Sequence, residues 1–173
     1  VCKPWRSDGD FILVCGQHDK SLQWESMLSM SNWFMQTYKE IRKHSQRPIL
    51  LRPHPRCRLP NIELGLEKVY RQEPRKLTGT YDDFDMKFDN IWATISWSSN
   101  PGIHSIINGV PAFVSNSSLA YPVANDIDFL HDIEDPHMGG RQAWLNDYAH
   151  TEYTVDEIAK GIPLTNLLDQ ITS

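Results

Sequence analysis

The chain has 173 residues, of which 40% are hydrophobic and 10% aromatic, and its net charge at pH 7 is −5. This length predicts one compact domain, and this apolar content excludes disordered and collagen-like chains. No stretch approaches the roughly 18 apolar residues of a membrane span, and the acidic balance disfavours sequence-independent binding to nucleic acid.

The first predicted elements are a strand and a helix. Residues 11–15 form an apolar run that ends at Gly16, which is typical of a buried parallel strand. Apolar residues then recur at three- and four-residue spacing over about 21–45, which predicts a helix beginning near Ser21. Four basic residues are expected to line the solvated face of this helix: Lys39, Arg42, Lys43 and Arg47.

A second buried strand is predicted at residues 49–51. It ends at Pro53 and Pro55, two prolines in three residues that predict a rigid loop rather than a continuing ladder. The segment that follows is less regular. Residues 66–70 suit either a strand or a helical turn, and residues 82–87 suit a short helix or a loop.

The pattern then becomes regular again. Residues 91–95 are predicted as a core strand, about 101–108 as a helix with Gly109 as its C-cap, and 111–114 as the next strand. Four short helical patterns follow: 126–132, 140–149, 154–160 and 163–171.

The alternation of strands and helices predicts an α/β fold, a Rossmann-like parallel sheet flanked by helices, with a helical C-terminal tail. We expect residues 1–173 to form a single domain, with a core over about 10–125 and the C-terminal helices over about 126–173. In such sheets ligands bind at the carboxyl ends of the strands. The candidate loops are therefore 16–21, 52–58, 96–102 and 115–120.

The distribution of charge is compatible with an anionic ligand. Residues 1–80 carry 14 basic and eight acidic residues, and such a basic half suits a ligand that bears phosphate. Gly16 and Gln17 precede a predicted helix start, where a glycine allows close approach and free N–H groups favour an anion. An ordinary strand–helix turn explains this pair equally well.

The segment Arg52-Pro-His54-Pro-Arg56 is more specific, because it holds an imidazole between two prolines with a guanidinium group on each side. Such groups can bind a phosphate, although a histidine that only caps backbone carbonyls is the alternative. Ser98 and Ser99 stand at another strand end before a helix. There they can donate to a phosphate or serve as an ordinary helix cap.

The cysteines and histidines do not suggest a metal site. Cys2, Cys15 and Cys57 are an odd number without a CxxC pair, which argues against a disulfide framework or a zinc site and fits a reducing compartment. The acidic, histidine-containing segment 131–137 has a spacing that matches no common ligand pattern. We therefore expect no metal, no cofactor and a cytoplasmic location.

Several of these motifs in combination resemble a known family. They are Val14-Cys-Gly-Gln17 with Ser21 and Trp24, then His54-Pro55, Ser96–Ser99, and Asn108-Gly-Val-Pro111. Together they are similar to the C-terminal, nucleotide-sugar-binding half of GT-B glycosyltransferases. The resemblance is closest to bacterial capsule polysaccharide transferases of the Kdo-transferring and sialyltransferase-like type.

The resemblance implies half of a GT-B fold in which His54, Ser98 and Ser99 hold the nucleotide phosphate, with Gly16 and Gln17 nearby. It implies a CMP- or UDP-linked sugar donor, and a glycan or other hydroxyl acceptor. The general base would come from a second domain or from another copy of the chain. The residues also leave open a non-catalytic nucleotide- or sugar-binding module, an interaction domain, and an enzyme like a nucleotide-sugar epimerase.

Overall fold

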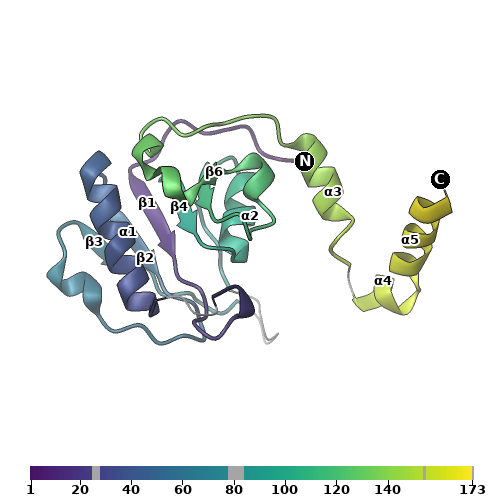
Figure 1. Cartoon of the computed structure of the whole chain (residues 1–173), viewed down its shortest axis with the longest axis horizontal. Coiled ribbons are helices and arrows are strands. Elements are labelled where there is room, and N and C mark those ends of the chain that lie inside the picture. The colour runs from purple at the N-terminus through teal and green to yellow at the C-terminus, as the bar shows by residue number, and fades with distance from the viewer. Residues whose placement is uncertain (25–27, 78–83, 154, 173) are drawn as a thin grey trace. The chain divides into compact units, whose positions relative to one another are not determined.

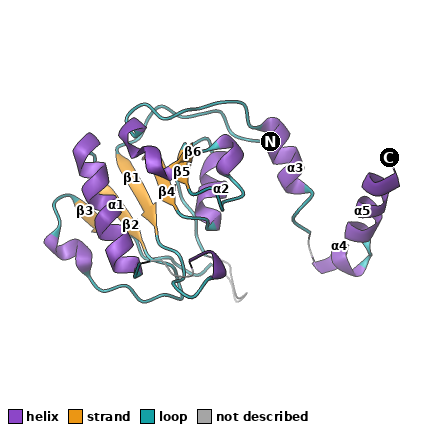
Figure 2. Ribbon diagram, viewed as in Figure 1, coloured by secondary structure: helices purple, strands orange, loops and turns teal. Residues whose placement is uncertain are grey.

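The computed structural model describes residues 1–24, 28–77, 84–153 and 155–172. The chain divides into two compact units, Val1–Gly140 and Arg141–Ser173. The first unit is an α/β unit with a central sheet, and the second consists of helices (Figures 1 and 2). The fold predicted from the sequence, a Rossmann-like sheet with C-terminal helices, is confirmed.

Within the described residues, six strands form one sheet in the order β3-β2-β1-β4-β5-β6, and every neighbouring pair is parallel. The strands are β1 Phe11–Cys15, β2 Ile49–Arg52, β3 Val69–Arg71, β4 Ile91–Ser96, β5 Ala112–Val114 and β6 Asn125–Asp126. This is the strand order of the doubly wound Rossmann sheet. The order reverses between β1 and β4, which makes the junction of these two strands the topological switch point.

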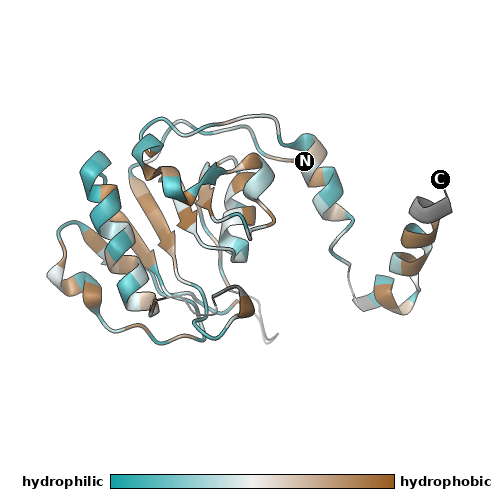
Figure 3. Cartoon of the chain, viewed as in Figure 1, coloured by the Kyte–Doolittle hydropathy of each residue, from teal (hydrophilic) through white to brown (hydrophobic). Residues whose placement is uncertain are grey.

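Helices cover the two faces of the sheet. Ile12 and Val14 of β1 pack in one cluster with α1 (Met30–His44) and with Leu130 of a 3-10 helix, Ile127–Asp132. Helix α2 (Asn100–Ile107) packs on the opposite face, where its Ser105 hydroxyl donates to the Thr94 hydroxyl of β4 at 2.8 Å. Figure 3 shows the strands as an apolar centre beneath the polar outer side of α1.

The predicted start of the first helix was wrong. Helix α1 begins at Met30, and the Ser29 hydroxyl caps it by accepting from the Asn32 N–H at 3.3 Å. Ser21 instead precedes a separate 3-10 helix, Leu22–Trp24. Tertiary packing accounts for this turn, because the buried Trp24 ring packs edge to face against Trp33 and Trp97, with ring centroids 5.6 and 5.7 Å apart.

The ambiguous middle segment forms a 3-10 helix, Ile62–Gly65, followed by strand β3, so residues 66–70 lead into a strand. Of residues 82–87, the first two lie outside the described residues. The rest are not helical, and Phe84 forms an isolated antiparallel bridge with Lys76. The sequence did not predict strand β6, because it has only two residues, Asn125 and Asp126, and both are polar. A further 3-10 helix, Tyr121–Val123, precedes it.

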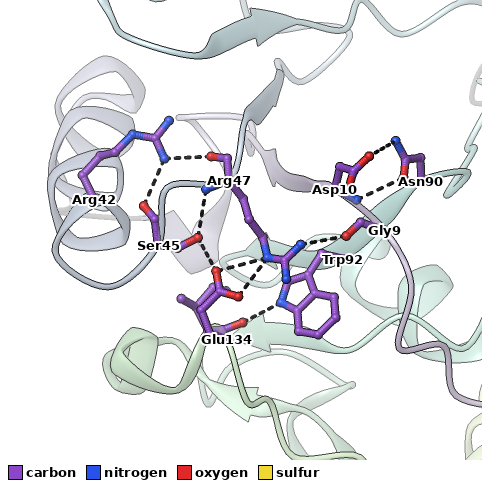
Figure 4. Close-up of polar contacts among 9 residues, drawn as sticks. Gly9, Asp10, Arg42, Ser45, Arg47, Asn90, Trp92 and Glu134 are labelled. Atoms are coloured by element: carbon purple, nitrogen blue, oxygen red, sulfur yellow. Dashed lines mark hydrogen bonds and ion pairs between the residues drawn. The ribbon is translucent and has the colours of Figure 1, made fainter.

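Arg47 was predicted on the solvated face of the first helix, and this is wrong. It follows α1, and its Nε donates to both carboxylate oxygens of Glu134 at 3.1 and 3.0 Å. Its guanidinium carbon lies 4.0 Å from the Trp92 ring centroid, and it also donates to the Gly9 carbonyl at 2.8 Å (Figure 4). The Ser45 hydroxyl donates to the same Glu134 carboxylate. Arg47 therefore joins the α1–β2 turn to the chain after the 3-10 helix at 127–132.

Arg42 lies on α1 as predicted but is half-buried rather than solvated. Its guanidinium donates to the carbonyls of Arg47 at 2.8 Å and Glu67 at 3.0 Å, which ties the helix end to the turn before β3. The remaining two basic residues, Lys39 and Lys43, are exposed on α1 as expected.

The second unit contains α3 (Gln142–Ala149), α4 (Val155–Ala159) and α5 (Ile162–Thr172), close to three of the predicted helical patterns. Trp144 and Tyr148 stack on one face of α3 with ring centroids 5.7 Å apart. The Asn166 side chain of α5 donates to the Tyr153 hydroxyl at 3.3 Å. Across the residues that are described, none of the helices is both long and apolar enough to cross a membrane.

One ion pair of the first unit makes the stability depend on pH. Arg71 of β3 donates from two nitrogens to the buried Glu63 carboxylate, each at 2.8 Å, and this pairing lowers the pKa of Glu63. A carboxyl whose pKa is lower in the folded state stabilises the fold above its unfolded pKa of about 4.3, and this contribution is lost as the pH falls further. Unfolding in urea at pH 7 and at pH 3.5 should show a smaller acid-induced loss for Glu63→Gln than for the wild type. Equal losses would contradict this role.

Candidate functional site

A cavity of about 690 Å³ opens at the carboxyl ends of β1, β2 and β4, at the switch point of the sheet. All the residues that the sequence predicted for a phosphate site line it: Gly16, Gln17, Arg52, His54, Arg56, Ser98 and Ser99. They come from three loops that are distant in sequence. The parallel sheet brings these loops together because each follows the carboxyl end of its strand.

Gln17 connects two of these loops. The residue is 5% exposed, and its side-chain amide nitrogen donates to the Ser21 hydroxyl at 2.8 Å. Its amide oxygen accepts from both the backbone N–H and the hydroxyl of Ser98, each at 3.0 Å. Both ends of the Gln17 amide are therefore engaged within the protein. This residue positions the β4 loop against the β1 loop.

His54 is held rigidly on the β2 loop between Pro53 and Pro55. Its Nδ1 accepts from the Arg56 N–H at 3.1 Å, so the neutral ring carries its proton on Nε2. The loop lies close to the end of β1, where the Gly16 N–H donates to the Arg52 carbonyl at 2.8 Å. A Cβ added to Gly16 would lie 3.4 Å from the His54 backbone nitrogen, so the two loops leave little room for a side chain at this position.

Arg52 lines the cavity but its guanidinium is largely committed to the protein. The residue is 5% exposed, donates to the Gln72 side chain at 3.2 Å and to the Asp85 carbonyl, and lies 3.9 Å from the Asp85 carboxylate. These contacts give Arg52 a positioning role for the segment that contains Asp85. Direct contact of Arg52 or of the exposed Arg56 with a phosphate stays a prediction.

Ser99 is the N-cap residue of α2, yet its hydroxyl makes no capping bond. The hydroxyl oxygens of Ser99 and Ser96 are buried and have no hydrogen-bond partner among the described residues. The first turn of a helix also has N–H groups without intrahelical acceptors. Ser99, Asn100 and Pro101 therefore bring a polar, electropositive helix start to the cavity wall.

Sequence reasoning missed several residues of the cavity. His18 follows Gln17 in the same loop, so its loop position could have indicated that it lines the cavity. His104 lies one turn along α2 from Asn100, so the helical period could have indicated the same for it. Phe84 and Met86 supply an apolar wall, and nothing in their local sequence signals this. Both residues lie in the segment that connects β3 to β4, and this segment passes beside the cavity.

The described lining of the cavity is rich in cationic and imidazole side chains. Its described lining holds Arg52, Arg56 and three histidines, and no carboxylate side chain. Cys15 lies at the base of the cavity, and burial raises its thiol pKa to about 12, so it is neutral at physiological pH. No group of three or more histidine, cysteine or acidic side chains within the described ranges could hold a metal ion. The cavity is chemically suited to an anion with an adjoining apolar part.

The fold and this cavity define a Rossmann-like domain with a cavity at its switch point, lined by histidine, serine and arginine side chains. No family model, curated protein or solved structure matches the chain.

Proposed function

We propose that the cavity binds the nucleotide of a nucleotide-activated sugar, and that this chain is the donor-binding domain of a glycosyltransferase. The observation that carries the proposal is the convergence of His54, Ser98 and Ser99 on one cavity at the switch point. Pockets at this position of doubly wound sheets are where nucleotides bind. The motif resemblance to transferases of the capsule polysaccharide class supports the same reading.

The proposed arrangement places the donor phosphate between the His54 loop and the start of α2. The nucleobase then lies against Phe84 and Met86. During transfer the bond from the anomeric carbon to the phosphate oxygen breaks, and its electron pair stays on the phosphate. The acceptor hydroxyl oxygen bonds to the anomeric carbon, and its proton passes to a base on a second domain or another copy. His54 and Arg56 stabilise the charge on the departing nucleotide, which is where preorganised donors are most effective.

The donor is CMP- or UDP-linked in this proposal, and the acceptor is a glycan or another hydroxyl compound. We infer a cytoplasmic location, because the three cysteines are free thiols, as is usual in a reducing compartment.

The test is calorimetric titration of the chain with CMP, UDP, GDP and ADP, repeated on His54→Asn. Asparagine can still accept the Arg56 N–H through its side-chain oxygen but lacks Nε2. We expect the wild type to bind one pyrimidine nucleotide selectively, and the variant to bind it about tenfold more weakly or worse, the value of one charge-assisted hydrogen bond. His44→Asn, on α1, is the matched control and should leave affinity unchanged.

Absence of binding to every nucleotide by the folded wild type would reject the proposal. So would equal affinity of the His54→Asn variant.

A non-catalytic nucleotide-binding module is the second candidate. It is favoured by the lack of a carboxylate in the described lining of the cavity, because general-base catalysis needs a proton acceptor within reach. Binding of the nucleotide together with no transfer and no donor hydrolysis, even when the acceptor domain is supplied, would establish this alternative.

A further inference from the structure

The apolar wall of the cavity belongs to a short antiparallel stem, formed by residues 75–76 after β3 and 84–86 before β4. Phe84 pairs with Lys76 in an antiparallel bridge. Phe84 and Met86 both line the cavity, beside the loops that follow β1 and β2. The stem therefore brings an aromatic ring and a thioether to a cavity whose other walls are mostly polar.

Asp85 joins the two sides of the stem to each other and to the sheet. Its N–H donates to the Arg75 carbonyl at 2.8 Å, and its carboxylate accepts from the Arg75 N–H at 2.9 Å. The Arg52 guanidinium donates to the Asp85 carbonyl and lies 3.9 Å from the carboxylate. Arg52 also donates to the Gln72 side chain at 3.2 Å. The side chains of Arg52 and Asp85 are only 6% and 18% exposed.

This connection to the sheet is a firm one. Arg52 is the last residue of β2, and its backbone pairs in register with Cys15 of β1. Its planar guanidinium fixes the direction of the bonds that it donates, and separating a buried ion pair leaves an uncompensated charge. Met86 packs against the buried cluster that contains Leu13 and Cys15. Phe84 is therefore held at a defined position relative to the ends of β1 and β2.

We propose that this stem is the base-recognition element of the site, in which Phe84 stacks on the nucleobase and Arg52 is a positioning residue that holds Phe84 in place through Asp85. The inference rests on the proposed function and assigns the part of the same site that selects a nucleotide. An aromatic face offers a stacking surface that any nucleobase can use and that a sugar phosphate without a base cannot. Arg52 acts on the base through the stem, rather than on the phosphate.

The first experiment compares a nucleotide with a ligand that lacks the base. The full chain is titrated with CMP, UDP, GDP and ADP by calorimetry, and with ribose 5-phosphate by NMR. We expect the wild type to bind its preferred nucleotide at least tenfold more tightly than ribose 5-phosphate. Phe84→Ala should weaken nucleotide binding about tenfold and change ribose 5-phosphate binding less than twofold. Phe129→Ala is the matched control. It removes a 53% exposed ring outside the described lining of the cavity and should change neither affinity.

A double-mutant cycle tests the positioning role of Arg52. Arg52→Lys keeps the positive charge but loses the planar fork that reaches both Asp85 and Gln72. We expect it to weaken nucleotide binding about fivefold in the wild-type background and less than twofold in the Phe84→Ala background. Its affinity for ribose 5-phosphate should stay within twofold of the wild-type value. A direct contact of Arg52 with the phosphate would instead weaken both ligands, and its effect would add to that of Phe84→Ala.

A further measurement uses the wild-type sequence, so it does not depend on whether a variant folds. The chain is labelled with carbon-13 at the methionine methyl groups, and nuclear Overhauser effects from the bound nucleotide are recorded. Protons of the nucleobase should show an effect to the Met86 methyl group, which lines the cavity. They should show none to Met30, which is buried in the core.

The outcomes separate this inference from the proposed function. Nucleotide affinity unchanged by Phe84→Ala, an equal loss for ribose 5-phosphate, or no effect from the nucleobase to the Met86 methyl would overturn the role of the stem while leaving a nucleotide site in place. Additive losses in the double-mutant cycle would overturn the positioning role of Arg52. Failure of the folded wild type to bind any nucleotide would reject both the inference and the proposed function.

Discussion

Replacing Gly102 with valine is expected to lower the free energy of unfolding by about 3 kcal/mol, the upper part of the range for overpacked sites. A Cβ at this position would lie 2.8 Å from the Ser96 hydroxyl oxygen and 2.9 Å from a Val114 methyl group. Both neighbours are fully buried in the sheet, where close packing opposes their displacement. Helix α2 must therefore shift away from β4 and β5.

The same substitution should abolish nucleotide binding, because Ser99 and His104 reach the cavity from α2. Urea unfolding measures the first effect and calorimetric titration with CMP and UDP the second. Gly65→Val is the matched control, since nothing lies within 4 Å of its Cβ position. A Gly102→Val protein as stable as this control would show that α2 does not need the glycine to approach the sheet.

Gly109→Ala is expected to be nearly as damaging, at about 3 kcal/mol in the free energy of unfolding. Gly109 has a φ of +80°, a left-handed conformation that costs an alanine about 1–2 kcal/mol. Its Cβ would also lie 2.0 Å from the Pro4 carbonyl oxygen, a contact with backbone rather than with a flexible side chain. The N-terminal segment must then leave its place beside α2, where the Lys3 N–H donates to the Ile107 carbonyl at 2.9 Å.

A second glycine separates these two causes. Gly161 has a φ of +73° but has open space around its Cβ position, so Gly161→Ala isolates the conformational cost. Thermal and urea unfolding of both variants should show a clearly larger loss for Gly109→Ala. Equal losses would mean that the contact with Pro4 does not contribute.

The strands of the core were predictable from local sequence. Residues 11–15, 49–51 and 91–95 are mainly apolar runs without polar alternation, and they are buried in the sheet apart from the partly buried Phe11, Leu50 and Trp92. The prediction of Gly109 as the C-cap of α2 was wrong by one residue: Asn108 is the C-cap, and Gly109 follows it in the left-handed conformation. The start of α1 was not predictable, because the packing of Trp24 against Trp33 and Trp97 decides where the chain turns.

The candidate site was predictable in its residues but not in their roles. Gly16, His54 and Ser98 share a cavity because each follows a parallel strand, and sequence alone predicts that strand ends collect ligands. Arg52 was taken for a ligand contact, yet its guanidinium is held by the Asp85 backbone and carboxylate. Arg52 and Asp85 are far apart in sequence, so no local pattern predicts that they pair. The ion pair of Arg47 with Glu134 was not predicted either, because these residues are also distant in sequence.

What the sequence by itself determined is the α/β class, the buried strands and the loops that carry histidine, serine and arginine, because hydrophobic period and turn chemistry are local properties. Only the tertiary structure decided which guanidinium groups are committed to internal partners and that Phe84 and Met86 form a cavity wall. It also brought His18 within 5.4 Å of His54. These features depend on strand order and on contacts between distant segments, which the folded chain creates through packing and no local pattern encodes.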